Sequence, residues 1–117
     1  MIPSIPQSLK IYITTEPVDF RKGMDGLAGY VAAHYELDPF SGAVFIFRSK
    51  TADKIKVLAW DGTGMVLIQK RLDGRKFVWP AMSRGAISIS RTQFEALFEG
   101  VDWRRIVPPR YSKPTVA

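Results

Sequence analysis

The sequence predicts an α+β domain: an antiparallel β-meander of about four to five strands, with a helix before it and a helix after it packed on one face. Three observations predict this fold. Short apolar runs joined by three turn segments, two of which contain Gly, fill residues 43–80. Apolar residues at helical spacing precede and follow that block. The chain of 117 residues is long enough for one core and too short for two.

The first elements are a strand and a helix. Leu9–Thr14 alternates apolar and polar residues, as a half-buried strand does. Asp19 follows, where its carboxylate can cap a helix. We expect Gly23, Gly26 and Gly29 in this helix to allow another backbone to approach closely. Spacings of four, three, four and four residues predict the apolar face of the helix, formed by Phe20, Met24, Leu27, Val31 and Tyr35.

Four strands are predicted in the central block. Their ranges are Ala43–Arg48, Lys54–Asp61, Met65–Leu72 and Lys76–Trp79. Turn sequences separate the last three strands, and Asp73-Gly74 favours a type I′ turn, in which both central residues have positive φ. This block therefore predicts consecutive hairpins.

The lengths of these turns set the pairing of the strands. We expect Lys54 opposite both Arg71 and Arg48, and Arg71 opposite Lys76. One face then carries the core residues Phe45, Phe47, Ile55, Val57, Val66, Ile68, Phe77 and Trp79. The other face carries a basic row across four strands, formed by Arg48, Lys54, Arg71 and Lys76, with Lys56 behind it.

A short strand, a helix and a tail are predicted after the meander. Ala86–Ser90 has the pattern of the strand, and Ser90 and Gln93 have the spacing of a capping box at the start of the helix. Gly100 lies where a C-terminal cap is expected. We assign residues 1–103 to a single α+β domain and residues 104–117, which hold three prolines and four cations, to a flexible basic tail.

The positive charge is concentrated in two segments. The chain holds 17 Lys and Arg against 11 Asp and Glu, a net charge of +6. Residues 48–84 carry +6 and residues 104–117 carry +4, whereas the other segments are mildly acidic. This distribution favours an anionic partner such as nucleic acid. The candidate DNA-binding residues are Arg48, Lys54, Lys56, Arg71, Lys76, Arg104 and Arg105.

The composition excludes several kinds of site. Without Cys there is no thiol nucleophile and no Cys-ligated metal or cluster. His34, the one histidine, has no evident partner in the sequence, and most Asp residues fit caps or turns. We therefore expect no catalytic activity, no metal and no cofactor. A metal-dependent nuclease that uses Asp25 stays a minor alternative.

Membrane and export signals are not found in the sequence. No apolar run reaches the length of about 20 residues that a membrane-spanning helix needs. Met1–Lys10 lacks the layout of a signal peptide. We expect a soluble cytoplasmic protein without membrane contact.

An ordered set of motifs resembles a known family. The motifs are Asp19–Leu27, Asp38–Gly42, Lys54–Gly64, Phe77–Pro80 and Leu97–Trp103. Together they resemble the small accessory protein (TnpB type) of the insertion sequence 66 family of bacterial transposable elements, over residues 9–103. The resemblance implies a role in DNA transposition beside a separate, larger transposase that carries the catalytic residues. It supplies no catalytic residue for this chain.

Two functions follow from these observations. The first is a non-catalytic accessory factor that binds DNA phosphates through the basic row and the tail. The alternative is an adaptor that docks on the transposase of the same element. Its candidate partner-binding residues are Leu58, Trp60 and Leu67, or Arg21 and Lys22. An exposed edge strand would also permit a homodimer.

Overall fold

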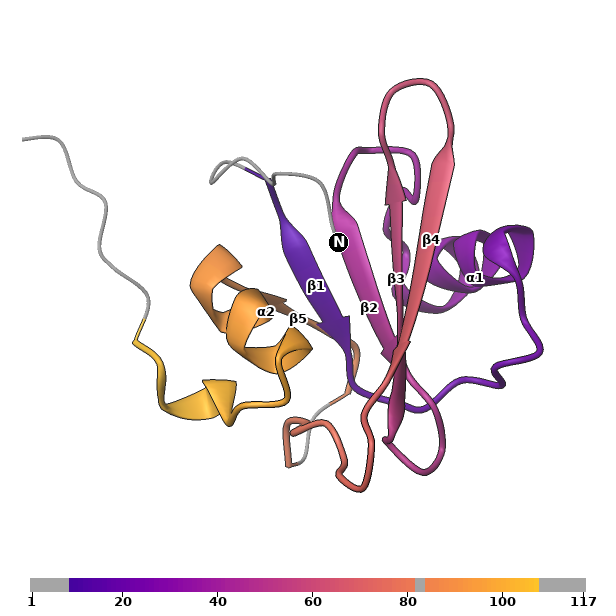
Figure 1. The fold of residues 1–117 in the computed structure, drawn as a ribbon. Coiled ribbons are helices and arrows are strands. Elements are labelled where there is room, and N and C mark those ends of the chain that lie inside the picture. Colours follow the sequence, from indigo (N-terminus) through magenta and orange to yellow (C-terminus); the bar gives the residue numbers. More distant parts are fainter. Residues whose placement is uncertain (1–8, 82–83, 108–117) are drawn as a thin grey trace, which may run out of the picture.

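A single mixed sheet forms the centre of the protein (Figure 1), in a computed structural model that describes residues 9–81 and 84–107. The sheet has five strands in the order β4-β3-β2-β1-β5. The strands are β1 (Ile11–Thr14), β2 (Val44–Arg48), β3 (Lys54–Trp60), β4 (Met65–Arg71) and β5 (Ala86–Ile89). The helices are α1 (Met24–Tyr30), followed by a π-helical turn (Val31–Tyr35), and α2 (Arg91–Phe98), followed by a 3-10 turn (Trp103–Arg105).

The pairing of β1 differs from the predicted meander. β1 runs parallel to β2, with Ile11 beside Val44, and antiparallel to β5, with Ile11 beside Ile89. A parallel pair needs a long crossover between its strands, and α1 lies in that connection. The predicted antiparallel pairing is confirmed for the pairs β2–β3 and β3–β4. The sheet as a whole is mixed, not purely antiparallel, because β1 and β2 are parallel.

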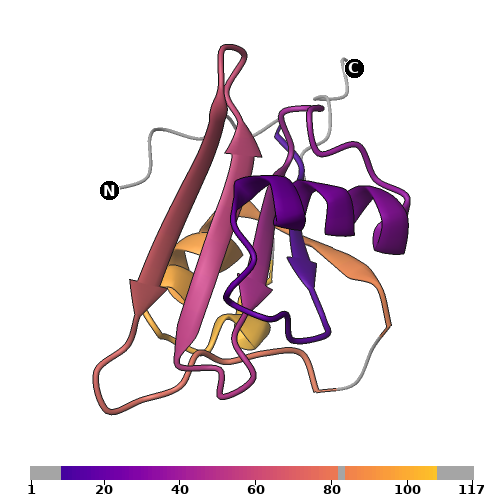
Figure 2. The ribbon, with the colours of Figure 1, turned by 90° about the vertical axis from the view of Figure 1, so that its right-hand side faces the viewer.

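The two helices cover opposite faces of the sheet, so the prediction that both pack on one face is wrong. In Figure 2, α1 crosses in front of the sheet and α2 lies behind it. Two separate apolar clusters result. The α1 face buries Val18, Leu27, Ala28, Val31, Ala43, Phe45, Phe47 and Leu58. The α2 face buries Ile11, Ile13, Val44, Ile46, Ile55, Val57, Leu72, Phe77, Ile89, Phe94, Leu97 and Trp103.

The register of β2 on β3 differs from the prediction by one residue. Arg48 pairs with Ile55, not with Lys54, because Ser49 is the residue that bonds Lys54, its N–H donating to the Lys54 carbonyl at 3.0 Å. Ala52, at φ 61°, turns the loop between them. A shift of one residue moves side chains to the opposite face. Phe45 and Phe47 therefore lie on a different face from Ile55 and Val57.

The predicted strand Lys76–Trp79 is absent. A type I′ turn requires positive φ at two residues, but at Asp73-Gly74 only Gly74 (φ 68°) has it. The Phe77 N–H donates to the Ala52 carbonyl at 2.7 Å, and the Trp79 indole N–H donates to the Thr14 carbonyl at 2.8 Å. Residues 72–80 therefore cross the end of the sheet toward β5.

The first helix starts later than predicted. Its N-cap is Gly23, without a side-chain cap, and Asp19 instead accepts the Arg21 N–H at 2.9 Å in the preceding turn. Leu27 is buried, but Met24 is 41% exposed. A Cβ atom at Gly23 or Gly29 would meet nothing within 4 Å, so the prediction of close backbone approach there is wrong.

The second helix has the predicted ends. The Ser90 hydroxyl accepts the Gln93 N–H at 3.1 Å, and the Gln93 side chain accepts the Ser90 N–H at 2.8 Å. Gly100, at φ 80°, follows the helix. The capping box and the glycine at the end of the helix are confirmed. Among the helices of the described residues, none has the length and apolarity to cross a bilayer.

Candidate functional site

The β3–β4 hairpin brings two predicted DNA-binding residues together. Lys54 and Arg71 are direct cross-strand partners, as predicted, on the α1 face at the open end of the hairpin. Arg71 is exposed and Lys54 is half-buried. These two cations are the part of the predicted basic row that the structure retains.

Arg48 lies on the other face of the sheet. It pairs with Ile55, whose side chain belongs to the core on the α2 side. Its guanidinium Nη1 donates to the carbonyls of Ser49 and Lys50, each at 3.4 Å. Arg48 therefore reaches the same end of the sheet as Lys54 but leaves the predicted row.

Lys56 is buried and bonded inside the protein. Only 6% of the residue is exposed. Its Nζ donates to the carbonyls of Phe20 and Lys22, both at 2.8 Å, and lies 4.9 Å from the centre of the Phe20 ring. Lys56 thus has its predicted place behind Lys54 on the same face of β3, but it is buried, because its ammonium group holds the loop before α1 against the sheet.

Lys76 is exposed, but in the segment that crosses the end of the sheet rather than in a strand. The hydrogen bond from Phe77 to Ala52 holds this segment beside the β2–β3 loop. A second hydrogen bond, from the Leu72 N–H to the Asp53 carbonyl at 2.9 Å, joins the same two segments. Lys76 is thus near Lys54 and Arg71 through loop contacts, not through the predicted strand pairing.

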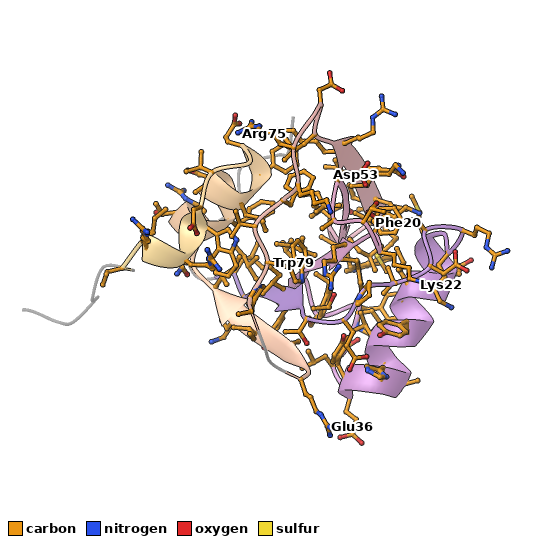
Figure 3. All side chains as sticks on the ribbon, turned by 90° about the horizontal axis from the view of Figure 1, so that it is seen from below. Phe20, Lys22, Glu36, Asp53, Arg75 and Trp79 are labelled. Atoms are coloured by element: carbon orange, nitrogen blue, oxygen red, sulfur yellow. The ribbon has the colours of Figure 1, made fainter. Side chains whose placement is uncertain are left out.

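These segments together form one basic end of the sheet. Figure 3 looks at this end, with Asp53 and Arg75 toward one border and Phe20 and Lys22 beside α1. Gly85 lies at the same end of the sheet, because its carbonyl accepts the N–H of Thr15, the residue after β1, at 3.1 Å. We define the basic end as Arg48, Lys50, Lys54, Arg71, Arg75, Lys76 and Arg84. The opposite end carries Asp38 and Asp61 in its loops.

Two carboxylates accompany the basic end. The Asp53 carboxylate accepts the Thr51 hydroxyl at 2.5 Å and the Ser49 hydroxyl at 3.3 Å. The hydrogen bond from Thr51, aided by the charge of Lys54, lowers the pKa of Asp53. Asp73 is exposed in the crossing segment. The cations of the basic end outnumber these carboxylates, so the end has a positive field.

Arg104 and Arg105 lie beside the crossing segment, in the 3-10 turn. The Trp103 indole N–H donates to the Val78 carbonyl at 2.7 Å, which attaches this turn. The Arg104 guanidinium is paired with Asp102 and holds the pKa of that carboxyl at about 2. Arg105 is exposed. Residues 108–117 of the predicted tail lie outside the described residues.

The predicted partner-binding residues on the sheet are not one exposed surface. Leu58 is fully buried under α1, so its predicted place on a docking surface is wrong. Trp60 and Leu67 are half-buried near the β3–β4 turn. Phe40, which is 56% exposed, meets the Trp60 ring edge to face at 5.6 Å between centroids.

Arg21 and Lys22 are exposed but lie away from Trp60. The Arg21 guanidinium binds the Asp19 carboxylate at 2.6 Å, which lowers the pKa of Asp19 to about 2. The backbone carbonyl of Lys22 accepts a hydrogen bond from the Lys56 ammonium group. The four residue steps along β3 from Lys56 to Trp60 span about 13 Å. The structure therefore separates the two halves of the predicted partner surface.

Sequence reasoning missed four exposed residues of these surfaces. Lys50, Arg75 and Arg84 belong to the basic end but not to the predicted strand faces. These cations were counted in the net charge of residues 48–84. The net charge of that segment therefore indicated the basic end better than the predicted strand faces did. Phe40, in the turn after Pro39, was not assigned to any surface, although an aromatic side chain in a turn is a simple marker of exposure.

Titratable groups elsewhere form one notable cluster. His34 Nε2 lies 3.2 Å from Glu16 Oε2, and its ring stacks on Tyr30 at 4.8 Å. The partner of His34 that was not evident in the sequence is therefore Glu16. Asp25 is exposed in α1. Within the described part of the chain, no group of three or more potential metal-ligating side chains is found.

Comparisons with known proteins give one family. A family model described as "IS66 Orf2 like protein" matches residues 9–108. Two similar proteins come from Sinorhizobium fredii (strain NBRC 101917 / NGR234). Uncharacterized protein y4jC is 39% identical over 109 residues, 93% of each chain, and uncharacterized protein y4hO is 40% identical over 115 residues, 98% of this chain and 97% of the relative. No solved structure matches.

Proposed function

This chain belongs to the IS66 Orf2-like family, and from that membership we propose that it is a non-catalytic accessory protein of DNA transposition that binds DNA phosphates at its basic end. The family supports the link to transposition. The binding mode is supported by one observation, the gathering of separate cationic segments at one end of the sheet. The catalytic residues would belong to the separate transposase.

The geometry favours phosphates over bases as the groups that are contacted. The cations come from loops and strand ends, and the exposed ones are Lys50, Arg71, Arg75, Lys76 and Arg84. Contacts from charged side chains to phosphates position a protein on DNA and carry no sequence readout. We therefore expect binding to element ends and to random duplexes with comparable affinity.

A charge-reversal pair tests this proposal. Arg71→Glu with Lys76→Glu changes two exposed side chains of the basic end. If both contact phosphates, the affinity for duplex DNA should fall about 30-fold at physiological salt. The slope of log K against log salt, about −4.5 for five contacts, should become shallower by about 2. Fluorescence anisotropy with labelled duplexes measures both quantities.

The matched control reverses the same charge at the other end. Lys10 and Arg91 are exposed, Lys10 before β1 and Arg91 at the start of α2. Lys10→Glu with Arg91→Glu produces the same net charge and should weaken binding much less. Equal losses for the two pairs would mean that only net charge matters. Affinity that does not change with salt would contradict phosphate binding altogether.

Docking on the transposase is a second candidate function, favoured by the Phe40–Trp60 pair. Phe40 is largely exposed and its ring contacts Trp60, at the end of the sheet opposite the basic end. Exposed aromatic side chains are frequent anchors of protein interfaces. Phe40→Ala with Trp60→Ala should abolish co-purification with the transposase while DNA affinity is unchanged. Full retention of the transposase would exclude this surface.

A further inference from the structure

Among the described residues, none pairs with the outer edge of strand β4. β4 is the last strand of the sheet, and Figure 2 shows no described element beyond it. It is seven residues long and begins with four apolar residues, Met65 to Ile68. Natural proteins protect such an edge with proline, a bulge or an outward lysine. β4 has no proline and pairs with β3 without a bulge.

The lysine of β4 does not guard this edge. Lys70 turns its ammonium group toward α2, where it donates to the Phe98 carbonyl at 2.6 Å and lies 4.4 Å from the centre of the Phe98 ring. The side chain is therefore held on one face of the sheet. Arg71 is exposed but lies at the last residue of the strand.

The hydrogen bonds at the two ends of the hairpin show which peptide groups point outward. The Asp61 N–H donates to Gly64 at 3.0 Å, and the Leu72 N–H donates to Asp53 at 2.9 Å. Bonded and non-bonded pairs alternate along an antiparallel ladder. Counting from both ends, the peptide groups of alternate residues point away from β3. These residues are Met65, Leu67, Gln69 and Arg71.

We propose that this edge pairs with β4 of a second copy of the chain, antiparallel, about a two-fold axis at Ile68. This register places Leu67 opposite Gln69 of the second copy and Met65 opposite Arg71 of the second copy. All four outward residues of each chain then form hydrogen-bonded pairs. An axis at Leu67 would leave Arg71 unpaired, so the Ile68 register is the most complete.

The charges also favour this register. Lys70 lies opposite Val66 of the second copy, and Arg71 opposite Met65, so no cation faces a cation. A parallel pairing in register would align like charges directly, which destabilises a sheet. The antiparallel arrangement also turns the two basic ends in opposite directions and keeps them apart.

The dimer has a consequence that rests on the proposed function. Two basic ends that face away from each other can each bind one duplex, so the dimer would hold two DNA molecules at once. Dimerisation is measured without DNA, and its failure is therefore distinguishable from a failure of DNA binding.

Sedimentation equilibrium of the full chain tests the pairing. We expect a reversible dimer. Gln69→Pro removes one outward N–H from each of the two chains and leaves the hydrogen bonds to β3 intact. The dissociation constant of the dimer should therefore rise at least about tenfold. Gln69→Ala keeps the N–H and should change it less than about threefold. A monomer at every concentration would overturn the proposal and leave the edge to a strand of another protein.

A second pair of variants depends on charge instead of backbone. Met65→Lys places an ammonium group opposite Arg71 of the second copy, and Met65→Glu places a carboxylate there. The dissociation constant should rise about threefold in the first variant and fall about threefold in the second. Equal shifts in one direction would contradict this register. With dimerisation removed by Gln69→Pro, each chain should still bind one duplex but no longer capture a second.

Discussion

Lys56 in β3 and Lys70 in β4 have a different role from the exposed cations that lie near them in the sequence. Each turns its ammonium group to a backbone carbonyl on one face of the sheet, Lys56 toward the loop before α1 and Lys70 toward the end of α2. Each also lies over a phenylalanine ring. A cation that is desolvated in this way stabilises packing between elements rather than attracting a ligand.

At this scale we predict that Lys56→Met destabilises the protein. The change keeps the apolar length of the side chain but leaves the carbonyls of Phe20 and Lys22 without their donor. The free energy of unfolding should fall by about 2 kcal/mol. Urea denaturation measures it, and hydrogen exchange should quicken in residues 19–22.

Lys54→Met is the matched control for this change. Lys54 lies two residues away on the same face of β3, at the basic end. Its substitution should alter stability by less than about 0.5 kcal/mol but weaken DNA binding. Lys56→Met should have the reverse pattern. If Lys56→Met weakens DNA binding without loss of stability, Lys56 has a direct role that its burial contradicts.

At the scale of elements, the two helices differ in how much their own sequences define them. α2 carries a complete capping box and ends at a glycine with positive φ. Both features are local, since they need only residues within one turn. α1 has no side-chain cap and contains two glycines among seven residues. It depends on Leu27, Ala28 and Val31 packing against the sheet.

We predict opposite effects for alanine at two glycines of these helices. At Gly100, φ is 80°, and a Cβ would lie 3.0 Å from Leu72 Cδ1. Gly100→Ala should lower the free energy of unfolding by about 2 kcal/mol, through backbone strain and the contact with Leu72. At Gly29, in α1, a Cβ would have no atom within 4 Å. Gly29→Ala should therefore raise the free energy of unfolding by up to about 1 kcal/mol.

Thermal or urea unfolding of the two variants checks this prediction. The difference between them is more informative than either value, because both changes add one methyl group. A destabilising Gly29→Ala would indicate that another molecule or segment covers that face of α1. A neutral Gly100→Ala would mean that the end of α2 can adopt another conformation.

At the scale of the whole molecule, the mixed sheet separates its charges. The parallel β1–β2 pair and the antiparallel neighbours bring the ends of β1, β2 and β4 and the start of β3 to one end. Residues 72–80 cross that same end. The cations of residues 48–84 therefore meet there, although they come from different strands and loops. The unequal distribution of charge between the two ends of the sheet therefore arises from the directions of the strands, not from any one segment.

Much of the local structure was predictable from sequence. The β3–β4 register was correct because the turn at Gly62 and Gly64 fixes it, and the capping box of α2 was correct because it is read within four residues. The β2–β3 register was wrong by one residue, because the geometry of a four-residue loop has several solutions. The unbroken apolar run 43–47, buried on both faces, was the sequence signal of helices on both sides.

The sequence alone thus determined the strands of the hairpin, the ends of α2, the net charge of each segment and the resemblance to the IS66 family. Only the tertiary structure decided that β1 is parallel to β2, that α1 and α2 cover opposite faces, and that Lys56 is buried while Lys50 and Arg75 join the basic end. The physical reason is the range of the interactions. Turns and caps are fixed by neighbours in the chain, whereas strand order and burial depend on contacts between distant segments.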